Sequence, residues 1–266
     1  MHIKMEYKVK IIAGPCQHES YQQSLRIAEH CADICARYKV DYIFKASYDK
    51  ANRSHLDGER GVGFNSTLSS FKMMKERNPN LQTLTDVHSV EDVYELTDHF
   101  NDAVDVLQIP AFLCRQTDLI QAACETDKIV NIKKGQFLAP WDVTGILSKT
   151  EGVREVWVTE RGTSFGYNNL VVDFNGMQYM LNNYSVPIFF DGTHSTQKPG
   201  ILGKSSGGNR ADVAGLTRAA SALGVTNFFL EVHPDPDNAP SDGPNMIYLD
   251  KFEEIVSDII SYSYTR

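Results

Sequence analysis

The chain has 266 residues, of which 42% are hydrophobic and 23% are charged, so it can bury a sizeable core and is not of a disordered composition. Its formal net charge of −8 disfavours nucleic acid as a partner, because duplex binding depends on a basic surface. We find neither a signal-peptide pattern nor the ~20 consecutive apolar residues that a membrane span needs. The five cysteines form no CxxC pair and no small-domain disulfide pattern. We therefore expect a cytoplasmic protein that binds neither membranes nor nucleic acid.

Short β-rich runs alternate with segments of helical spacing along the whole chain. The predicted strands cover 9–13, 42–47, 82–87, 104–109, 129–133, 155–160, 187–191 and 227–232. The predicted helices cover 21–38, 66–77, a segment that opens at Ser89 with a capping box, 116–125, 141–150, 174–182, 209–223 and 249–262.

This alternation, without a break in composition, predicts an α/β fold: a single (β/α)8 TIM barrel over residues 1–266. An open, doubly wound sheet would show the same alternation. Its nucleotide-binding version is disfavoured, because neither GxGxxG nor a P-loop follows the first strand.

Most of the conspicuous polar residues lie just after a predicted strand. A barrel gathers the C-terminal ends of its strands on one face, so these side chains should converge on one site. They include Cys16, Lys45, Ser47, Lys50, Asn52, Arg53, Ser54, Asp86, His88, Gln108, Arg115, Lys133, Lys134, Arg161, Asp191, His194, Glu231 and His233.

Six cations among these residues belong to four different strands: Lys45, Lys50, Arg53, Arg115, Lys133 and Arg161. Like charges crowded at one rim would repel one another unless an anion binds among them. Arginine suits bidentate recognition of phosphate or carboxylate, and lysine acts as a point charge. We expect a small ligand that carries more than one phosphate or carboxylate.

Cys16, His194 and Glu231 follow strands one, seven and eight, which are neighbours in a closed barrel, and Asp242 lies in the next loop. Thiolate, imidazole and carboxylate ligands together suit a divalent ion such as Zn²⁺, Fe²⁺ or Mn²⁺. Spacing alone leaves other metal ligands open, namely His18, His88 and His233. It also leaves open that Glu231 and His194 act as acid–base groups without a metal.

Two predicted loops have sequence features of loops that close over a bound ligand. The turn at 207–210, Gly-Gly-Asn-Arg, precedes a predicted helix whose N-terminus favours anions, although an ordinary turn has the same pattern. The proline-rich stretch 233–244 is a stiff loop that carries carboxylates, which suits a fixed ligand better than a mobile lid.

Several longer motifs resemble those of one known family, the 3-deoxy-D-manno-octulosonate 8-phosphate (Kdo-8-phosphate) synthases, over about residues 11–243. The motifs are FKAS at 44–47, DKANRS at 49–54, QIPAFLCRQTD at 108–118, NIKKGQF at 131–137, ERGT at 160–163, FGYNNLVVD at 165–173, DGTHS at 191–195 and EVHPDP at 231–236. After Ser54 the family often has Ser-Ile-His, whereas this chain has His-Leu-Asp, so we assign no role there.

The resemblance implies a homotetrameric (β/α)8 barrel that condenses phosphoenolpyruvate with D-arabinose 5-phosphate and water. The products would be Kdo 8-phosphate and phosphate, on the path to the lipopolysaccharide inner core. The family's phosphoenolpyruvate contacts fall on Lys45, Ser47, Lys50, Ala111, Arg115, Lys133 and Arg161. Its pentose phosphate contacts fall on Asn52, Arg53 and Ser54, with Asp86 and Gln108 close by.

Gly-Pro-Cys at 14–16 is similar to the metal-dependent branch of the family, whose other branch carries Asn in place of the cysteine. The resemblance thus implies Cys16, His194, Glu231 and Asp242 as metal ligands with a part in catalysis. Lys50 is expected to donate a proton or a hydrogen bond to the aldehyde oxygen.

Two other functions remain open. The related DAHP synthases use erythrose 4-phosphate, but they typically show Lys-Pro-Arg-Thr-Ser where this chain has Lys-Ala-Asn-Arg-Ser at 50–54, which favours the pentose. A non-catalytic barrel that binds sugar phosphates is the second. We expect no feedback control, because the sequence contains no additional domain that could house a regulatory site.

Overall fold

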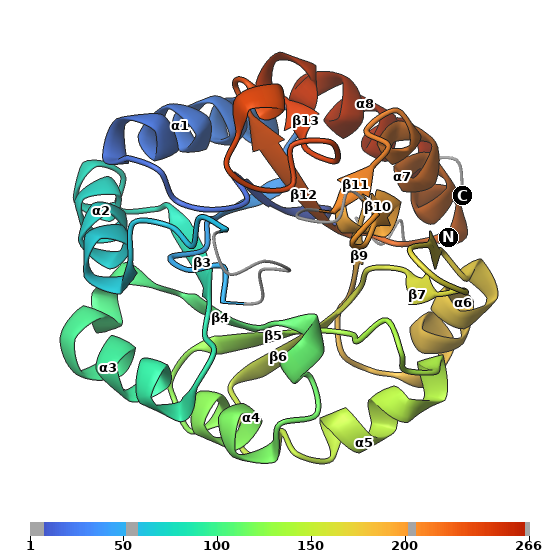
Figure 1. Ribbon diagram of the computed structural model, residues 1–266, viewed down its shortest axis with the longest axis horizontal. Coiled ribbons are helices and arrows are strands. Elements are labelled where there is room, and N and C mark those ends of the chain that lie inside the picture. The colour runs from blue at the N-terminus through green and yellow to red at the C-terminus, as the bar shows by residue number, and fades with distance from the viewer. Residues whose placement is uncertain (1–7, 52–57, 202–205, 264–266) are drawn as a thin grey trace, which may run out of the picture.

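The computed structural model describes residues 8–51, 58–201 and 206–263, and Figure 1 looks along the axis of a barrel with an outer ring of helices. The barrel strands are β1 (Lys10–Gly14), β2 (Asp41–Lys45), β3 (Gln82–Asp86), β4 (Val106–Ile109), β5 (Ile129–Lys133), β6 (Glu155–Glu160), β9 (Ile188–Asp191) and β12 (Asn227–His233). The helices are α1 (Tyr21–Arg37), α2 (Phe64–Arg77), α3 (Val90–Phe100), α4 (Thr117–Cys124), α5 (Val143–Leu147), α6 (Phe174–Asn183), α7 (Asp212–Leu223) and α8 (Phe252–Ser263).

The barrel closes through strand β1, which pairs in parallel with both β2 and β12. Ala13 lies opposite Phe44 on one side and Leu230 on the other. The remaining neighbours, from β2 to β12, also pair in parallel. An open sheet would leave the first and last strands with unpaired edges. The predicted single barrel is confirmed, and the open doubly wound sheet is excluded.

The barrel interior begins with an apolar layer, to which each strand contributes one buried side chain. This apolar floor consists of Ile12, Ile43, Leu84, Val106, Ile129, Trp157, Phe189 and Phe229. Alternate strand residues point outward instead, and Ile11, Phe44 and Leu107 join the core between strands and helices. Helix α1 buries Ile27 and Cys31 in that same outer core.

A polar layer lies directly above the floor. Because side chains alternate along a strand, the residue two positions after each floor residue again faces the interior. These positions carry Gly14, Lys45, Asp86, Gln108, Asn131, Thr159, Asp191 and Glu231. The seven side chains among them are buried. Seven of the eight strands thus deliver a polar side chain to the end of the barrel where their C-termini meet.

Several short strands follow the main strands at the C-terminal end of the barrel. The stretch after β6, predicted as a long loop, contains the hairpin of β7 (Thr163–Ser164) and β8 (Leu170–Val171). Strands β10 (Gln197–Lys198) and β11 (Gly207–Gly208) form a second pair, and β13 (Ile247–Tyr248) extends the sheet beside β12. These strands are two residues long, so no alternation could reveal them in the sequence.

The predicted helices are all present, with shifted ends. The capping box is confirmed, since the Ser89 hydroxyl accepts a hydrogen bond from the Asp92 amide and the Asp92 side chain accepts one from the Ser89 amide. Helix α5 is much shorter than its predicted range, because a 3-10 turn at Pro140–Asp142 replaces the first part.

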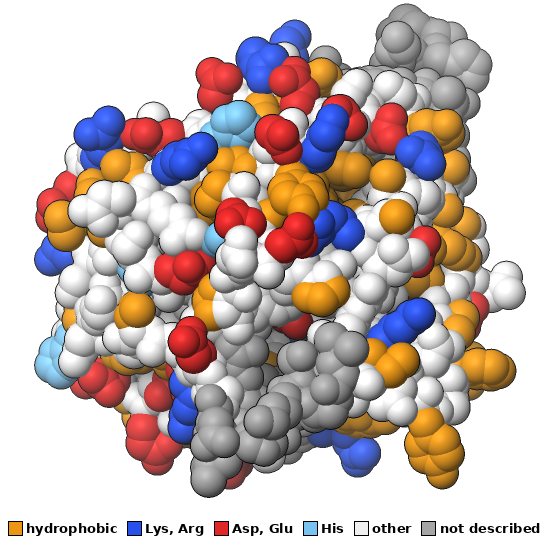
Figure 2. Space-filling model, turned by 45° about the horizontal axis from the view of Figure 1, so that its top comes forward, with side chains coloured by type: hydrophobic (Ala, Val, Ile, Leu, Met, Phe, Trp, Pro, Cys, Tyr) orange, Lys and Arg blue, Asp and Glu red, His pale blue; other side chains and the backbone are white. Residues whose placement is uncertain are grey.

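Within the described residues, no helix combines the length and the apolar character that a membrane crossing requires. On the face that Figure 2 shows, lysine and arginine side chains are interspersed with aspartate and glutamate rather than gathered into one basic area.

Candidate active site

A cavity of about 650 Å³ opens where the C-terminal ends of the strands meet. Its volume is in the usual range of small-molecule sites. Its wall includes these residues that the sequence singled out: Lys45, Lys50, Asp86, Gln108, Ala111, Lys133, Arg161, His194 and Asp242. Cys16, Ser47 and Glu231 are buried just behind the wall and contact it. Asn52, Arg53 and Ser54, to which we assigned the pentose phosphate, lie outside the described residues.

One side of the cavity brings together the thiol and the carboxylates of the predicted metal site. The ligand atoms of Cys16, Glu231 and Asp242 all lie within 4.8 Å of one another. His194 faces the same group, with its Nε2 atom 3.5 Å from Glu231 Oε1 and 3.6 Å from Asp242 Oδ2. Glu231 lies in β12, Cys16 just after β1, and His194 and Asp242 in the segments after β9 and β12, so only the closed barrel brings the four together.

Asp191, at the end of β9, orients the imidazole of His194. Its Oδ2 atom lies 2.6 Å from His194 Nδ1, and its Oδ1 atom accepts a hydrogen bond of 2.8 Å from the His194 amide. With Nδ1 held in this way, Nε2 is the nitrogen that points at the carboxylates, an arrangement common behind metal-binding histidines. Burial lowers the pKa of His194, but the charges of Asp191 and Glu231 outweigh it and raise the pKa above its usual value.

The donor set fits a divalent cation. Glu231 Oε2 is buried and has no hydrogen-bond partner in the described part of the chain, and such an atom is costly unless something binds it. Burial raises the pKa of the Cys16 thiol far above its usual value, and the charge of Asp242 raises it further. Asp242 itself adopts a left-handed backbone (φ 52°), a strained conformation that recurs at functional sites.

The cations of the cavity are paired with carboxylates or amides. Lys45 Nζ lies 2.8 Å from Glu231 Oε1, and Lys133 Nζ forms an ion pair with Asp191. Our expectation that these cations would repel one another without an anion was therefore wrong, because the same strand ends also supply the countercharges. Burial nevertheless lowers the pKa of Lys133 to about 8, in spite of Asp191.

Arg161 keeps one unused donor. Its Nη2 group donates to Gln197 Oε1, whereas its buried Nε atom has no hydrogen-bond partner among the described residues. Gln197 in turn donates to Asp242 Oδ1 at 2.9 Å. Gln197 therefore links Arg161 to the predicted metal site, and no sequence pattern selects Gln197.

Lys50 and Asp86 also line the cavity. Lys50 Nζ donates to Ser47 Oγ at 2.9 Å, and the Ser47 hydroxyl donates to Asp86. Burial lowers the pKa of Lys50, but the neighbouring Cys16 and Glu231 outweigh it and raise the pKa above its usual value. Burial raises the pKa of Asp86, but Lys45 and Lys50 outweigh it, so its pKa falls below the usual range. Lys50 is a charged donor at neutral pH.

Arg115 stands apart from this group. It is exposed, it is not part of the cavity wall, and its carbonyl oxygen accepts a hydrogen bond from Lys149. Lys134 is buried away from the cavity, with its Nζ atom 3.2 Å from Glu160 Oε2. These two cations do not join the others at the site in the described chain.

The three alternative histidines occupy other surroundings. Both ring nitrogens of His18 face serine hydroxyls, at 2.7 and 3.1 Å. His233 Nε2 lies 2.9 Å from Glu19 Oε1, and its Nδ1 accepts the Asp235 amide. His88 lines the cavity near Asp92, on the side of β3 and far along the barrel from β12. His194 is the histidine that faces the carboxylates of the metal group.

The turn at 207–210 has a structural explanation. A Cβ atom on Gly208 would lie 1.4 Å from Asn245 Oδ1, so the second glycine is needed for close packing. Arg210 donates to the Met246 and Gly243 carbonyls and to Asp237, which ties the turn to the proline-rich loop. The bonds to Asp237 and Gly243 hold the proline-rich loop on both sides of Asp242, which lies in the cavity wall. This agrees with the fixed loop that the sequence predicts.

The chain matches the family described as DAHP synthetase I over residues 3–263. This chain belongs to the DAHP synthetase I family. Its similar members include proteins named 2-dehydro-3-deoxyphosphooctonate aldolase. The one from Nitrobacter winogradskyi is 49% identical over 256 residues, which are 96% of this chain and 88% of that protein. Those from Caulobacter vibrioides (49%, with 96% and 88% of the two chains covered) and Rickettsia bellii (49%, with 95% and 90%) are equally similar.

Membership of the DAHP synthetase I family agrees with the resemblance that the motifs showed. The match also covers the strands, the metal-ligand group and the cavity cations alike, since it extends across almost the whole chain.

Proposed function

We propose that this family member condenses phosphoenolpyruvate with D-arabinose 5-phosphate and water, releasing phosphate and forming 3-deoxy-D-manno-octulosonate 8-phosphate, a precursor of the lipopolysaccharide inner core. The observation that carries the proposal is the composition of the cavity. The cavity wall carries Lys50, Lys133 and Arg161 together with Asp242 of the Cys16–Glu231–Asp242 group, and Arg161 Nε has no hydrogen-bond partner among the described residues. The name shared by relatives that are 49% identical supports the same reaction.

Phosphoenolpyruvate carries a phosphate and a carboxylate, which need cationic donors in a buried setting. Arg161 Nε and the Lys133 ammonium supply them. The aldose then brings its aldehyde carbon to C3 of the enol. Holding the two reactants in attack geometry supplies ~7–11 kcal/mol of the barrier.

In the reaction, C3 of the enol forms a bond to the aldehyde carbon, water adds to C2, and the phosphate leaves from C2. Negative charge develops on the aldehyde oxygen, which takes up a proton. Lys50 is a charged donor on the cavity wall, so we assign it to that oxygen. Asp86 and Gln108 hold the Ser47 side of the cavity, where we place the pentose.

We further propose that Cys16, His194, Glu231 and Asp242 hold a divalent cation, Zn²⁺, Fe²⁺ or Mn²⁺, as in the metal-dependent branch of the family. Such an ion supplies Lewis-acid polarisation of an oxygen ligand. Asp191 keeps His194 Nε2 available to the ion, and Glu231 Oε2, which has no hydrogen-bond partner among the described residues, offers a second ligand atom. The alternative, in which Glu231 and His194 act without a metal, predicts full activity after chelation.

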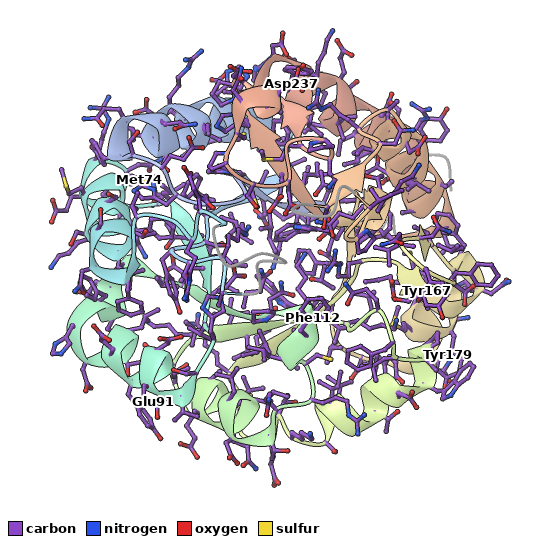
Figure 3. The ribbon with its side chains drawn as sticks, in the orientation of Figure 1. Met74, Glu91, Phe112, Tyr167, Tyr179 and Asp237 are labelled. Atoms are coloured by element: carbon purple, nitrogen blue, oxygen red, sulfur yellow. The ribbon has the colours of Figure 1, made fainter. Side chains whose placement is uncertain are left out.

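We also propose that the enzyme acts in the cytoplasm, where its five cysteines, all free of disulfides, would stay reduced. For the tetramer that the resemblance implies, we propose as contacts the exposed aromatic side chains of Phe137, Trp141, Phe165, Tyr167 and Tyr179. The rings of Trp141 and Tyr179 pack edge to face with their centroids 6.0 Å apart, and Figure 3 shows Tyr167 near α6, the helix that carries Tyr179. Light scattering of the wild type and of a Trp141→Glu variant tests this assembly, which predicts smaller species for the variant.

Phosphate release tests the proposed reaction. Phosphoenolpyruvate is mixed with the enzyme alone, with arabinose 5-phosphate or with erythrose 4-phosphate, each with and without added metal. Release that requires the pentose supports the proposal. Release that is faster with erythrose 4-phosphate indicates a DAHP synthase, and no release with either aldose indicates a binding protein. An Arg161→Met variant controls for contaminating phosphatase.

A further inference from the structure

A continuous line of hydrogen bonds crosses the polar layer of the barrel from β6 to the loop after β2. We call it the relay. It joins six side chains in the order Thr159, Asn131, Gln108, Asp86, Ser47 and Lys50. Five neighbouring strands or their loops each contribute at least one member, so the relay follows the curve of the barrel wall.

The bonds of the relay are short and buried. Thr159 Oγ1 donates to Asn131 Oδ1 at 2.7 Å, and Asn131 Nδ2 donates to Gln108 Oε1 at 2.8 Å. Gln108 Nε2 then donates to one oxygen of Asp86. The Ser47 hydroxyl donates to the other oxygen of Asp86, as described above.

The direction of every bond follows from the chemistry of two members. The Asp86 carboxylate can only accept, so Gln108 must turn its NH₂ group toward it and its carbonyl toward Asn131. Asn131 must then donate, which leaves its own carbonyl for the Thr159 hydroxyl. At the other end, the Lys50 ammonium can only donate, so Ser47 must accept from it and donate to Asp86.

Asn131 and Thr159 are fully buried and are not part of the cavity wall. They cannot touch a ligand in the cavity, yet their hydrogen bonds determine how Gln108 is oriented. If Gln108 turned its carbonyl to Asp86, two acceptors would meet in a buried site, which is costly. The Asp86 carboxylate would then no longer hold the Ser47 hydroxyl in a fixed orientation. Lys50 would in turn lose the fixed acceptor of its ammonium group.

We infer that Asn131 and Thr159 are positioning residues that hold the Lys50 ammonium in place through the Gln108–Asp86–Ser47 line. The inference rests on the proposed function only for the role of Lys50 toward the aldehyde. Asn131 and Thr159 select the amide orientation, Asp86 fixes the hydroxyl of Ser47, and Ser47 aims Lys50 into the cavity. Replacing Asn131 or Thr159 should slow the chemical step and leave the binding of phosphoenolpyruvate by Lys133 and Arg161 unchanged.

The test compares Thr159→Val, which removes only the hydroxyl, with Thr159→Ser, which keeps it. We expect Thr159→Val to lower kcat about three- to tenfold, the loss of one buried hydrogen bond, with the KM for phosphoenolpyruvate unchanged. Thr159→Ser should recover most of kcat. The matched control is Thr83→Val on β3, which removes an equally buried hydroxyl that bonds the Ala103 carbonyl outside the relay.

A double-mutant cycle tests the connection directly. Asn131→Ala and Thr159→Val act on the same line, so the loss in kcat for the pair should be clearly smaller than the product of the single losses. Thr83→Val should combine with Thr159→Val multiplicatively. Equal effects of Thr83→Val and Thr159→Val on kcat, or multiplicative losses for Asn131 and Thr159, would overturn the inference.

A second readout does not depend on turnover. Competitive labelling with an amine acylating reagent measures the rate at Lys50 relative to exposed Lys72 in the same protein. Thr159→Val should change the Lys50-to-Lys72 ratio, and Thr159→Ser and Thr83→Val should leave it as in the wild type. If the wild type shows no condensation but this pattern holds, the proposed reaction fails and the relay stands. An unchanged ratio in Thr159→Val overturns the relay whatever the activity.

Discussion

Cys16 Sγ lies 3.2 Å from Asp242 Oδ2, although 226 positions separate the two residues in the chain. Burial and the charge of Asp242 keep the pKa of this thiol high, so in the metal-free chain it holds its proton. A thiolate needs a cation beside it, and the carboxylates of Glu231 and Asp242 attract one to this place.

Replacing Cys16 with serine should therefore weaken metal binding and reduce activity, and chelation should abolish the activity of the wild type. Reconstitution with Co²⁺ supplies a readout apart from turnover, because a sulfur-to-cobalt absorption band appears only if the thiolate binds. Metal uptake should also release a proton from the thiol. A fully active chelated enzyme would rule out the metal assignment. An active, metal-free Cys16→Asn variant would indicate that the metal mainly orients ligands.

Asp191→Asn tests how His194 is oriented. The amide keeps the shape of the carboxylate but can present its NH₂ group to the imidazole, so Nε2 is no longer favoured as the free nitrogen. We expect about 10- to 100-fold weaker metal affinity, measured by competition with a chromophoric chelator. Asp235→Asn, in the loop after β12 and outside the cavity wall, is the control. An unchanged metal affinity in Asp191→Asn would show that Asp191 does not support the metal site.

From the pKa of Lys133 we predict how the binding of phosphoenolpyruvate depends on pH. Its pKa of about 8 lies below the ordinary 10.5, so the ammonium loses its proton as the pH rises through 8. The KM for phosphoenolpyruvate should increase above that pH. Lys133→Arg should give a flat KM over the same range. Because the unfolded chain binds this proton more tightly, the contribution of Lys133 to stability should rise between pH 8 and 10.5. A wild-type KM that stays constant to pH 10 contradicts the assignment.

The close packing of the apolar floor should contribute strongly to the free energy of unfolding. Leu84→Ala should lower the free energy of unfolding by about 2–5 kcal/mol, since the site is enclosed by seven other floor side chains. Urea denaturation measures the loss. Leu84→Met, which roughly conserves volume, should cost less than about 1.5 kcal/mol. Equal losses for the two variants would mean that the floor is not closely packed.

Much of the fold could be predicted because alternation of strands and helices is local in the sequence. The closure between β1 and β12 followed from the count of units, and it brought Cys16 and Glu231 to neighbouring strand ends. The hairpin of β7 and β8 could not be seen, since its strands are too short to show a period.

The site was only partly predictable, for a reason visible in the polar layer. Lys, Arg, His and Cys attract attention by their chemistry, whereas Asn131 and Thr159 are uncharged residues that bind neither a metal nor a phosphate by charge. The rule that would have selected them is positional: each follows a floor residue by two, as Asp191 and Glu231 do. Gln197 follows no strand of the barrel, so only the folded loop reveals its link between Arg161 and Asp242.

The most direct measurement is a competition in one vessel, with phosphoenolpyruvate, metal-loaded enzyme and equal amounts of arabinose 5-phosphate and erythrose 4-phosphate. Mass spectrometry of the products reports the ratio of the two kcat/KM values. We predict that the eight-carbon 3-deoxy sugar acid phosphate is the main product, formed together with one phosphate per molecule. A dominant seven-carbon product, or phosphate release without a new carbon–carbon bond, would contradict it.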